Sequence, residues 1–433
     1  MMKSSNRQHP SLQRVRATLV VLFVFLSACK DNSNNASDGS NAEIEIPDVP
    51  RPGVADECGS VRMTQYTSSD SRWCGFDRTS PILPDFVQAG MTVAVAEPYN
   101  GSSYGGAPGE ACGECWEVST TFATQTVMVH DLCPIEGNPV CAGGHFHFDV
   151  AAEVASVIDG GGWLGEAAVR RVPCPVTGNI HVHISSRNQW GYMQIAFFNH
   201  RVPIRTVEYR APAGDAWMPM YRCLARWCQE EDMETFSNNG PGGIFRLTAA
   251  NGDVVESTEV LSYDVSEGSD FDLGVQFAEI SEPEGVCQFT PPGDVYTDEW
   301  GGIDGVRWMW NEWGNTTLSE ITDNCAGGSA SCIHLNNFAD SGVHLTYRHV
   351  FPSDTFSTIS VQLRADTPGT VEIAPRTEEA RCANPVSFDV TDVWSTVELN
   401  IAESCPVEDW LHGLTISRST GLSTLTLDNI IFE

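Results

Sequence analysis

The sequence predicts an all-β protein with three domains. Short runs of alternating apolar and polar side chains recur along the chain, as in 359–363 (ISVQL) and 397–401 (VELNI), and turn residues separate such runs about every ten positions. In the first domain only the segment 150–158 predicts a helix. A chain of 433 residues is long enough for several domains with separate cores.

The composition limits the partners and the chemistry. A net charge of −33 disfavours nucleic acid and polyanionic polymers, so a neutral partner is expected. The sequence has no lysine after Lys30, which excludes Schiff-base and lysine general-base chemistry beyond that residue. Setting Cys29 aside, the 15 cysteines leave an even number, which favours disulfides in an exported protein over zinc. We expect no cofactor and a monomer.

The first 29 residues are typical of an export signal. Basic residues precede an apolar run, 17–25, and the segment ends in LSAC at Cys29, which resembles a bacterial lipobox. This predicts cleavage before Cys29, lipidation of its sulfur and sorting to the outer membrane, facing outward. The alternative is an ordinary signal peptide and a secreted protein. Residues 30–56 are polar and predict a disordered linker.

Two alternating segments of the first domain place carboxyl groups on predicted strands. In 127–131 (VMVHD), valines alternate with methionine and histidine, which predicts a half-buried strand with Asp131 at its end on the valine face. In 144–152 (GHFHFDVAA), the phenylalanines point one way and the histidines and Asp149 the other. Two carboxyls near the ends of neighbouring strands can differ in pKa and act on a ligand in a groove.

Two other interpretations of these segments remain open. Asp131 could cap a turn while the histidines lie on a solvated strand face. Alternatively, His145, His147 and Asp149 could bind a metal at an open facial site.

Several motifs in order resemble the first domain of expansins. They are 63–67 (MTQYT), 111–117 (ACGECWE), 129–134 (VHDLCP), 147–149 (HFD) and 169–174 (VRRVPC). The resemblance implies a six-stranded double-psi β-barrel over 57–175. It also implies three disulfides, Cys74 with Cys112, Cys115 with Cys174 and Cys133 with Cys141. Proximity adds Cys223 with Cys228, and Cys58 is left for one of the five C-terminal cysteines.

The resemblance also implies roles for single residues. Asp149 and Asp131 would make polar contacts that grip a glucan chain, with Thr64 supporting Asp149 and Tyr66 lining the groove. We add His147, on the Asp149 face, as a substrate-binding residue.

Family-45 glycoside hydrolases share this type of barrel, but the position of their catalytic base is occupied by a serine in this sequence. Those enzymes use an acid that matches Asp149 and a base at the position of Ser68, whose hydroxyl is too weak a base at neutral pH. Inverting hydrolysis requires both groups. Asp70 would restore the pair if the loop bends, so hydrolysis remains the runner-up.

The second domain, 176–262, presents aromatic residues on one strand face. In 190–198 (WGYMQIAFF), odd positions form the core face, while Trp190 and Tyr192 lie on the opposite face, where a sugar ring can stack. The segment 195–203 resembles the expansin carbohydrate-binding domain, an immunoglobulin-like sandwich. The family's third aromatic falls near Ala225, so Trp227 is taken as its substitute.

The last part of the chain has no counterpart in expansins. An acidic linker, 263–286, precedes a region, 287–433, whose first and last strands resemble galactose-binding-like jelly rolls. Asp298 and Asp428 are candidates for a structural calcium site. A cluster of four tryptophans is equally compatible with core packing and with sugar stacking: Trp300, Trp308, Trp310 and Trp313.

Together these features predict an expansin-like protein, not a hydrolytic enzyme, that binds cellulose or related plant cell-wall glucan and loosens it without cleavage. The alternatives are a family-45-like endoglucanase, a lytic transglycosylase acting on peptidoglycan, and a cellulose adhesin.

Overall fold

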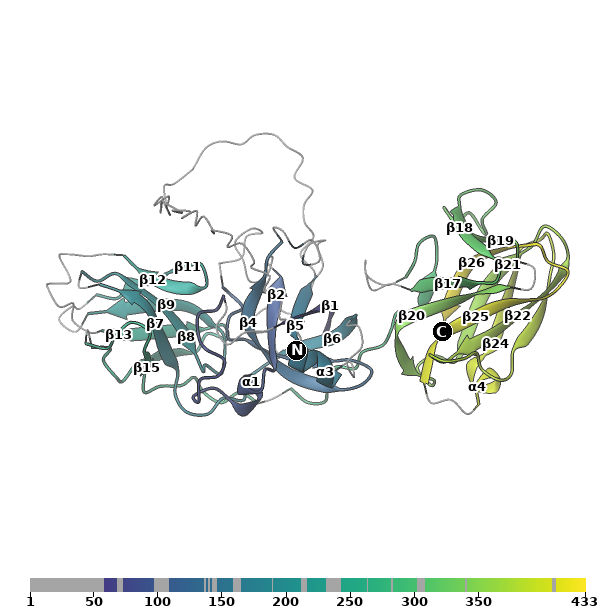
Figure 1. The fold of residues 1–433 in the computed structure, drawn as a ribbon. Helices are drawn as coiled ribbons and strands as arrows, with labels where there is room; N and C mark the ends of the chain where they lie inside the picture. Colours follow the sequence, from purple (N-terminus) through teal and green to yellow (C-terminus); the bar gives the residue numbers. More distant parts are fainter. Residues whose placement is uncertain are drawn as a thin grey trace, which may run out of the picture. The chain divides into compact units, whose positions relative to one another are not determined.

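The computed structural model describes residues 58–67, 73–96, 109–135, 138, 141, 146–158, 165–188, 190–211, 216–230, 243–262, 264–281, 283–301, 308–338, 341–406 and 410–433. These residues form strands almost throughout (Figure 1), which confirms the predicted all-β class. None of the helices among them has the length and apolar character needed to cross a membrane. The predicted signal segment, Cys29 and the linker 30–56 lie outside the described residues.

The first domain is a closed six-stranded barrel with the strand order β1-β5-β2-β4-β3-β6. Most neighbouring strands are antiparallel, but β1 pairs with β5 and β2 with β4 in parallel, as in the predicted double-psi barrel. Two short helices, α1 and α3, accompany the barrel (Figure 1). The elements are β1 (Gly59–Tyr66), α1 (Asp85–Gln88), β2 (Thr92–Ala96), β3 (Cys115–Ser119), β4 (Thr124–Cys133), β5 (His147–Ala151), α3 (Ala152–Ile158) and β6 (Glu166–Val172).

The barrel interior is filled by the apolar residues that the alternation predicts. Phe146 and Phe148 are buried with ring centroids 4.9 Å apart, and Trp116 packs against both. Each large apolar side chain buried in this way stabilises the fold by about 1.5–3 kcal/mol. The predicted helix is present as α3, although the first two residues of the predicted span belong to β5.

The second domain is a sandwich of two antiparallel sheets, ordered β10-β9-β13-β14 and β11-β12-β8-β7-β15. Apolar residues from both sheets form one core. The predicted boundary at residue 262 is wrong, because β15 pairs with β7 and the core includes Leu273 and Phe277. The strands are β7 (His181–Arg187), β8 (Met193–Phe198), β9 (Ile204–Arg210), β10 (Met218–Pro219), β11 (Tyr221–Cys223), β12 (Arg226–Gln229), β13 (Ile244–Ala249), β14 (Val254–Glu256) and β15 (Asp270–Asp272).

The third module is also a β-sandwich with its own core. One sheet has the order β18-β19-β26-β21-β24 with β16 paired to β26, and the other has the order β17-β20-β25-β22-β23. The elements are β16 (Asp294–Tyr296), β17 (Met309–Trp313), β18 (Thr317–Ile321), β19 (Cys332–Asn336), β20 (Gly342–Pro352), β21 (Thr358–Arg364), β22 (Gly369–Arg376), β23 (Val386–Val390), β24 (Ser395–Asn400), α4 (Ile401–Ser404), β25 (Trp410–Thr420) and β26 (Thr424–Phe432).

Seven disulfides join the fourteen cysteines from Cys58 onward. All four predicted pairs are confirmed, and the partner of Cys58 is Cys287, at the start of the third module. The remaining pairs lie within that module: Cys325 with Cys332 and Cys382 with Cys405.

Candidate functional site

A β-bulge in β4 directs Asp131 out of the barrel. Val129 pairs with Val93 on β2, whereas the next residue of β2, Ala94, pairs with Asp131, so His130 is an extra residue in β4. His130 is fully buried, and its Nε2 lies 2.9 Å from the carbonyl oxygen of Phe76. The bulge shifts the alternation by one residue. Asp131 is therefore half-exposed and does not continue the buried valine face, in contrast to the sequence prediction.

The two aspartates flank one small residue of the strand between them. Ala94 pairs with Asp131 on β4 and with Asp149 on β5, and Thr64 of β1 pairs with Asp149. The aspartates therefore belong to strands that both neighbour β2, not to adjacent strands as predicted. Because neighbouring strands lie about 4.8 Å apart, their backbones are about 10 Å apart. The polar side chains of Thr64, Asp149 and Asp131 thus form a row across four strands on the outside of the barrel, with Ala94 between the two aspartates.

The environment of Asp149 raises the pKa of its carboxyl group. Burial raises its pKa, the Thr64 hydroxyl lowers it by donating a hydrogen bond, and the charge of Asp131 raises it again. Asp131 is fixed differently, since its Oδ1 accepts hydrogen bonds from the backbone N–H groups of Trp73 at 3.2 Å and Leu132 at 2.9 Å. One carboxyl is therefore biased toward the protonated form, while the other is held in a fixed orientation by the backbone.

His147 supports this row from inside the protein. Its side chain is fully buried, so the prediction that it contacts substrate is wrong. Its Nε2 lies 2.9 Å from Thr64 Oγ1, and Thr64 donates its single proton to Asp149 Oδ1 at 2.7 Å. His147 must then donate to Thr64, which places a proton on Nε2. The three side chains form one directed chain of hydrogen bonds ending on Asp149.

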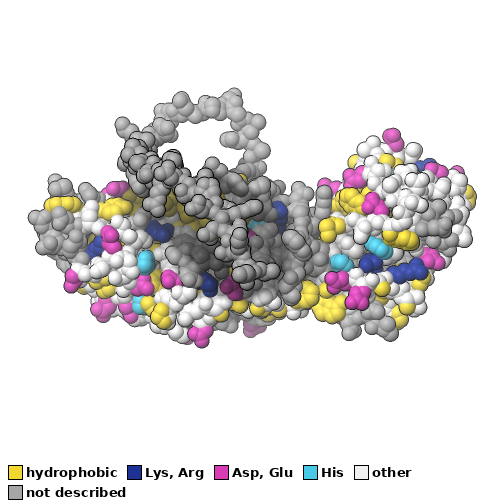
Figure 2. Space-filling view, in the orientation of Figure 1, with side chains coloured by type: hydrophobic (Ala, Val, Ile, Leu, Met, Phe, Trp, Pro, Cys, Tyr) yellow, Lys and Arg dark blue, Asp and Glu magenta, His cyan; other side chains and the backbone are white. Residues whose placement is uncertain are grey.

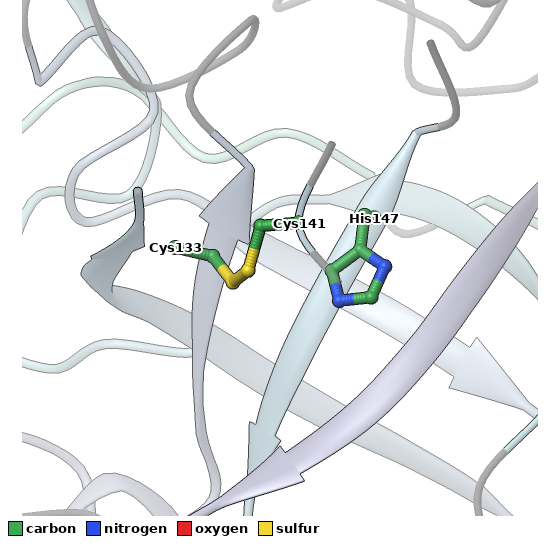
Figure 3. Close-up of side chains that lie close together, drawn as sticks. All are labelled: Cys133, Cys141 and His147. Atoms are coloured by element: carbon green, nitrogen blue, oxygen red, sulfur yellow. A yellow bond between two sulfur atoms is a disulfide. The ribbon is translucent and has the colours of Figure 1, made fainter. Parts of the chain in front are cut away.

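The disulfide between Cys133 and Cys141 lies next to His147. Figure 3 shows His147 next to Cys133 and Cys141, and ligand atoms of the three residues lie within 4.8 Å of one another. The sulfurs are bonded to each other, so neither offers the thiolate that binds metals. Among the described residues no group of three candidate ligands includes both His147 and Asp149. His145, the third residue of the predicted metal site, lies outside the described residues.

Tyr66 borders the same row. It is half-buried at the end of β1 and packs against the small cluster formed by Ala94 and the disulfide Cys133–Cys141. Cys133 Sγ is also 3.8 Å from Asp149 Oδ2. Ser68 and Asp70, on which the hydrolase interpretation depends, lie outside the described residues.

The predicted aromatic pair of the second domain lies at a hairpin between β7 and β8. Asn188 Oδ1 accepts hydrogen bonds from the backbone N–H groups of Trp190 at 2.9 Å and Tyr192 at 3.2 Å. Both aromatic side chains are half-buried, whereas Met193 and Ile195 point into the core as predicted. The turn thus fixes the backbone of two aromatic residues whose side chains are partly exposed.

The barrel region is similar in sequence to known proteins. Residues 61–159 match the family model described as EXPB1-like domain 1. The barrel is an expansin-like domain. Expansin-like protein 2 of Dictyostelium discoideum is 27% identical over 249 residues, covering 56% of this chain and 53% of that protein. Expansin-like protein 6 of the same organism is 28% identical over 188 residues, covering 41% of this chain and 59% of that protein.

The chain thus spans between half and three fifths of the length of these two relatives. Among solved structures, the apo expansin of Clavibacter michiganensis is 19% identical, with a TM-score of 0.41, and covers 52% of this chain and 100% of its own.

Trp227 does not extend the aromatic surface of the domain that follows the expansin-like barrel. It pairs with Ile195, so it faces the core and is only 5% exposed. The guanidinium of Arg222 lies 4.1 Å from the centre of its ring. Trp227 could replace an aromatic at Ala225 only if the chain were extended between them, but Leu224 has a positive φ of 56° and Ala225 lies in the tight β11–β12 turn.

Sequence reasoning missed a contact that links the expansin-like barrel to the second domain. Arg226 donates to the carbonyl oxygen of Trp73 at 2.6 Å and, within its own domain, to Ser185 Oγ at 3.2 Å. The N–H of Trp73 in turn holds Asp131. No local signal in the sequence indicates this link, because it depends on how the segment carrying Trp73 lies against the second domain.

Of the two aspartates of the predicted calcium site, Asp298 lies in the bend after β16 and Asp428 lies within β26. Asp298 Oδ1 accepts from the backbone N–H of Ala330 at 2.6 Å, and the buried Asp428 accepts from Ala326 at 3.0 Å and Asn429 at 2.8 Å. Backbone groups therefore use these oxygens. Calcium binding stays a prediction.

Proposed function

We propose that the protein binds cellulose or a related neutral glucan and loosens it without net bond cleavage. The row of Thr64, Asp149, Ala94 and Asp131 carries this proposal. It presents two carboxyls and a hydroxyl along the outside of an expansin-like barrel. Such groups can exchange hydrogen bonds with the hydroxyls of a glucan chain and compete with the bonds between neighbouring chains.

The accessible aromatic pair supports retention on the polymer. The backbone N–H groups of Trp190 and Tyr192 are both bonded to Asn188, and the partly exposed rings offer apolar faces on which a sugar ring can stack. The net charge of −33 favours neutral over anionic polysaccharide at low salt.

A single experiment tests the proposal against hydrolysis. The full chain is assayed for creep of heat-killed plant wall under load, and reducing-end release from amorphous cellulose is measured on the same sample. We expect creep without sugar release, and we expect Asp149→Asn to abolish creep. Asp85→Asn is the matched control, because Asp85 is an exposed carboxyl at the start of α1. Sugar release that disappears in Asp149→Asn would instead assign hydrolysis, since a raised pKa also suits a general acid.

We also propose that the chain is exported and lipidated at Cys29. Seven disulfides support an oxidising compartment. Metabolic labelling with a fatty acid tests this: the label should be incorporated into the full chain and be lost in Cys29→Ser. Equal labelling of the two proteins would contradict it.

A further inference from the structure

Two tryptophans of the third module lie on opposite faces of the same edge strand. β17 is the outermost strand of its sheet, and Trp310 and Trp313 are 41% and 39% exposed. Trp310 pairs with the core residue Leu345 and stacks on Trp300, with ring centroids 4.7 Å apart. Trp313 pairs with Gly342 and therefore lies on the outer face of the sheet.

The backbone of β20 allows the Trp313 indole to cover the sheet surface. A Cβ at Gly342 would clash with the carbonyl oxygen of Ile416 on β25 and would lie 2.8 Å and 2.9 Å from Cζ2 and Cε2 of Trp313, so glycine leaves room both for the neighbouring strand and for the ring. The ring of His344 stacks beside it, with centroids 6.3 Å apart and planes inclined by 26°. The indole is thus fixed against glycine and histidine while more than a third of its surface remains accessible.

Polar side chains continue this outer face across the neighbouring strands. His344 Nδ1 lies 3.0 Å from Thr415 Oγ1 on β25. Further along, Arg381 forms an ion pair with Glu372 of β22 at 3.1 Å and donates to Ser417 Oγ at 3.4 Å. Figure 2 shows histidine and basic side chains next to hydrophobic ones on this module. The outer face of the sheet therefore carries the Trp313 ring and, on the neighbouring strands, side chains that can form hydrogen bonds.

This combination matches the chemistry of a β-linked hexose chain. Pyranose rings have an apolar face that stacks on an indole, and their equatorial hydroxyls reach groups at the ring edge. We propose that the outer face of the sheet β17-β20-β25-β22-β23, centred on Trp313 and His344, binds a neutral glucan chain independently of the barrel.

The ionisable groups beside Trp313 suit a neutral ligand, because His344 is uncharged and Arg381 is paired, while the guanidinium of Arg376 donates to the carbonyl oxygen of Glu378. Burial, together with the nearby charge of Arg376, lowers the pKa of His344 to about 4, so the imidazole is neutral at ordinary pH. The charge of Arg381 is compensated by Glu372.

The test uses the full chain carrying Trp190→Ala and Tyr192→Ala, which removes the proposed aromatic surface of the second domain. Affinity electrophoresis through hydroxyethyl cellulose and calorimetry with cellohexaose measure binding. We expect Trp313→Ala to weaken binding about tenfold and Trp310→Ala to leave it unchanged. Trp310 is the matched control, because it has the same residue type, strand and exposure but the opposite face.

His344→Ala provides a second variant if Trp313→Ala does not fold, and it should weaken binding as well. The proposal is overturned if the background protein binds neither glucan, if the outer-face variant that folds binds as tightly as its parent, or if Trp310→Ala weakens binding equally. Tighter binding of polygalacturonate than of hydroxyethyl cellulose would also overturn the assignment to a neutral ligand.

Discussion

The hydroxyl of Thr64 donates a 2.7 Å hydrogen bond to the carboxylate of Asp149. The two residues are register partners on the parallel strands β1 and β5, so the barrel itself sets their contact. This bond opposes the effects of burial and of Asp131, both of which raise the pKa of Asp149. Thr64 therefore lowers the pKa of Asp149 against the two effects that raise it.

Replacing Thr64 should change the pKa of Asp149 and leave the fold intact. In Thr64→Val the hydrogen bond to the ionised form is lost, so the pKa of Asp149 should rise further. Carbon-detected NMR titration of the labelled carboxyl measures this shift. Thr64→Ser keeps the hydroxyl and should titrate like the wild type. An unchanged pKa in Thr64→Val would show that the bond does not stabilise the carboxylate.

The aromatic pair of the second domain should dominate retention on insoluble cellulose. Trp190→Ala combined with Tyr192→Ala should remove most binding in a pull-down assay, because each stacked ring contributes about 1 kcal/mol. The melting temperature should change little, since both side chains are only half-buried. Trp217→Ala is a control, because this half-buried tryptophan packs against Arg210 and Arg246 of the other sheet. Undiminished retention would refute the role of the pair.

Trp227 should behave in the opposite way. Trp227→Ala removes a large side chain from the core of the second domain, so we expect the free energy of unfolding to fall by about 3–5 kcal/mol. Urea unfolding followed by fluorescence measures this loss. Below the unfolding transition, cellulose retention should equal that of the wild type. If Trp227→Ala were as stable as the wild type but bound cellulose poorly, Trp227 would have to belong to the binding surface.

Acidification should destabilise the protein through His200. Burial lowers the pKa of this histidine from 6.5 to about 4, and its Nδ1 lies 2.9 Å from the carbonyl oxygen of Val202. Between these two pH values the unfolded chain binds a proton that the folded chain does not, so stability falls as pH falls from about 6.5 to about 4. The loss can reach about 3 kcal/mol.

The effect of His200 can be separated from that of other groups by comparing urea unfolding of the wild type and His200→Gln at several pH values. The difference between them should shrink as the pH approaches 4, because only the wild type loses this contribution. Burial also lowers the pKa of His181, which acts in the same direction in both proteins. A difference independent of pH would contradict the prediction.

The sequence was informative where a strand is regular and its neighbours are set by alternation. Phe146, Phe148, Met193 and Ile195 are buried as predicted, and Thr64 and Asp149 meet as the resemblance to expansins implied. The direction of Asp131 could not be predicted, because the bulge at His130 exists only in the register between β4 and β2.

Other features depended on tertiary context in the same way. The segment around Asp270 is acidic and was predicted to be a linker, yet it is a strand because the edge of β7 offers it backbone partners. The burial of Trp227 follows from its pairing with Ile195, which no local pattern encodes.

The disulfide between Cys58 and Cys287 also sets the mechanical path through the molecule. The two cysteines are 229 positions apart in the sequence, so their disulfide closes a covalent loop that contains the barrel and the second domain. When the chain is pulled between a point before Cys58 and the third module, the load passes through the sulfur bridge and not along the backbone of the enclosed residues. A polymer dragging on the third module would therefore leave the contacts around Asp149 free of tension.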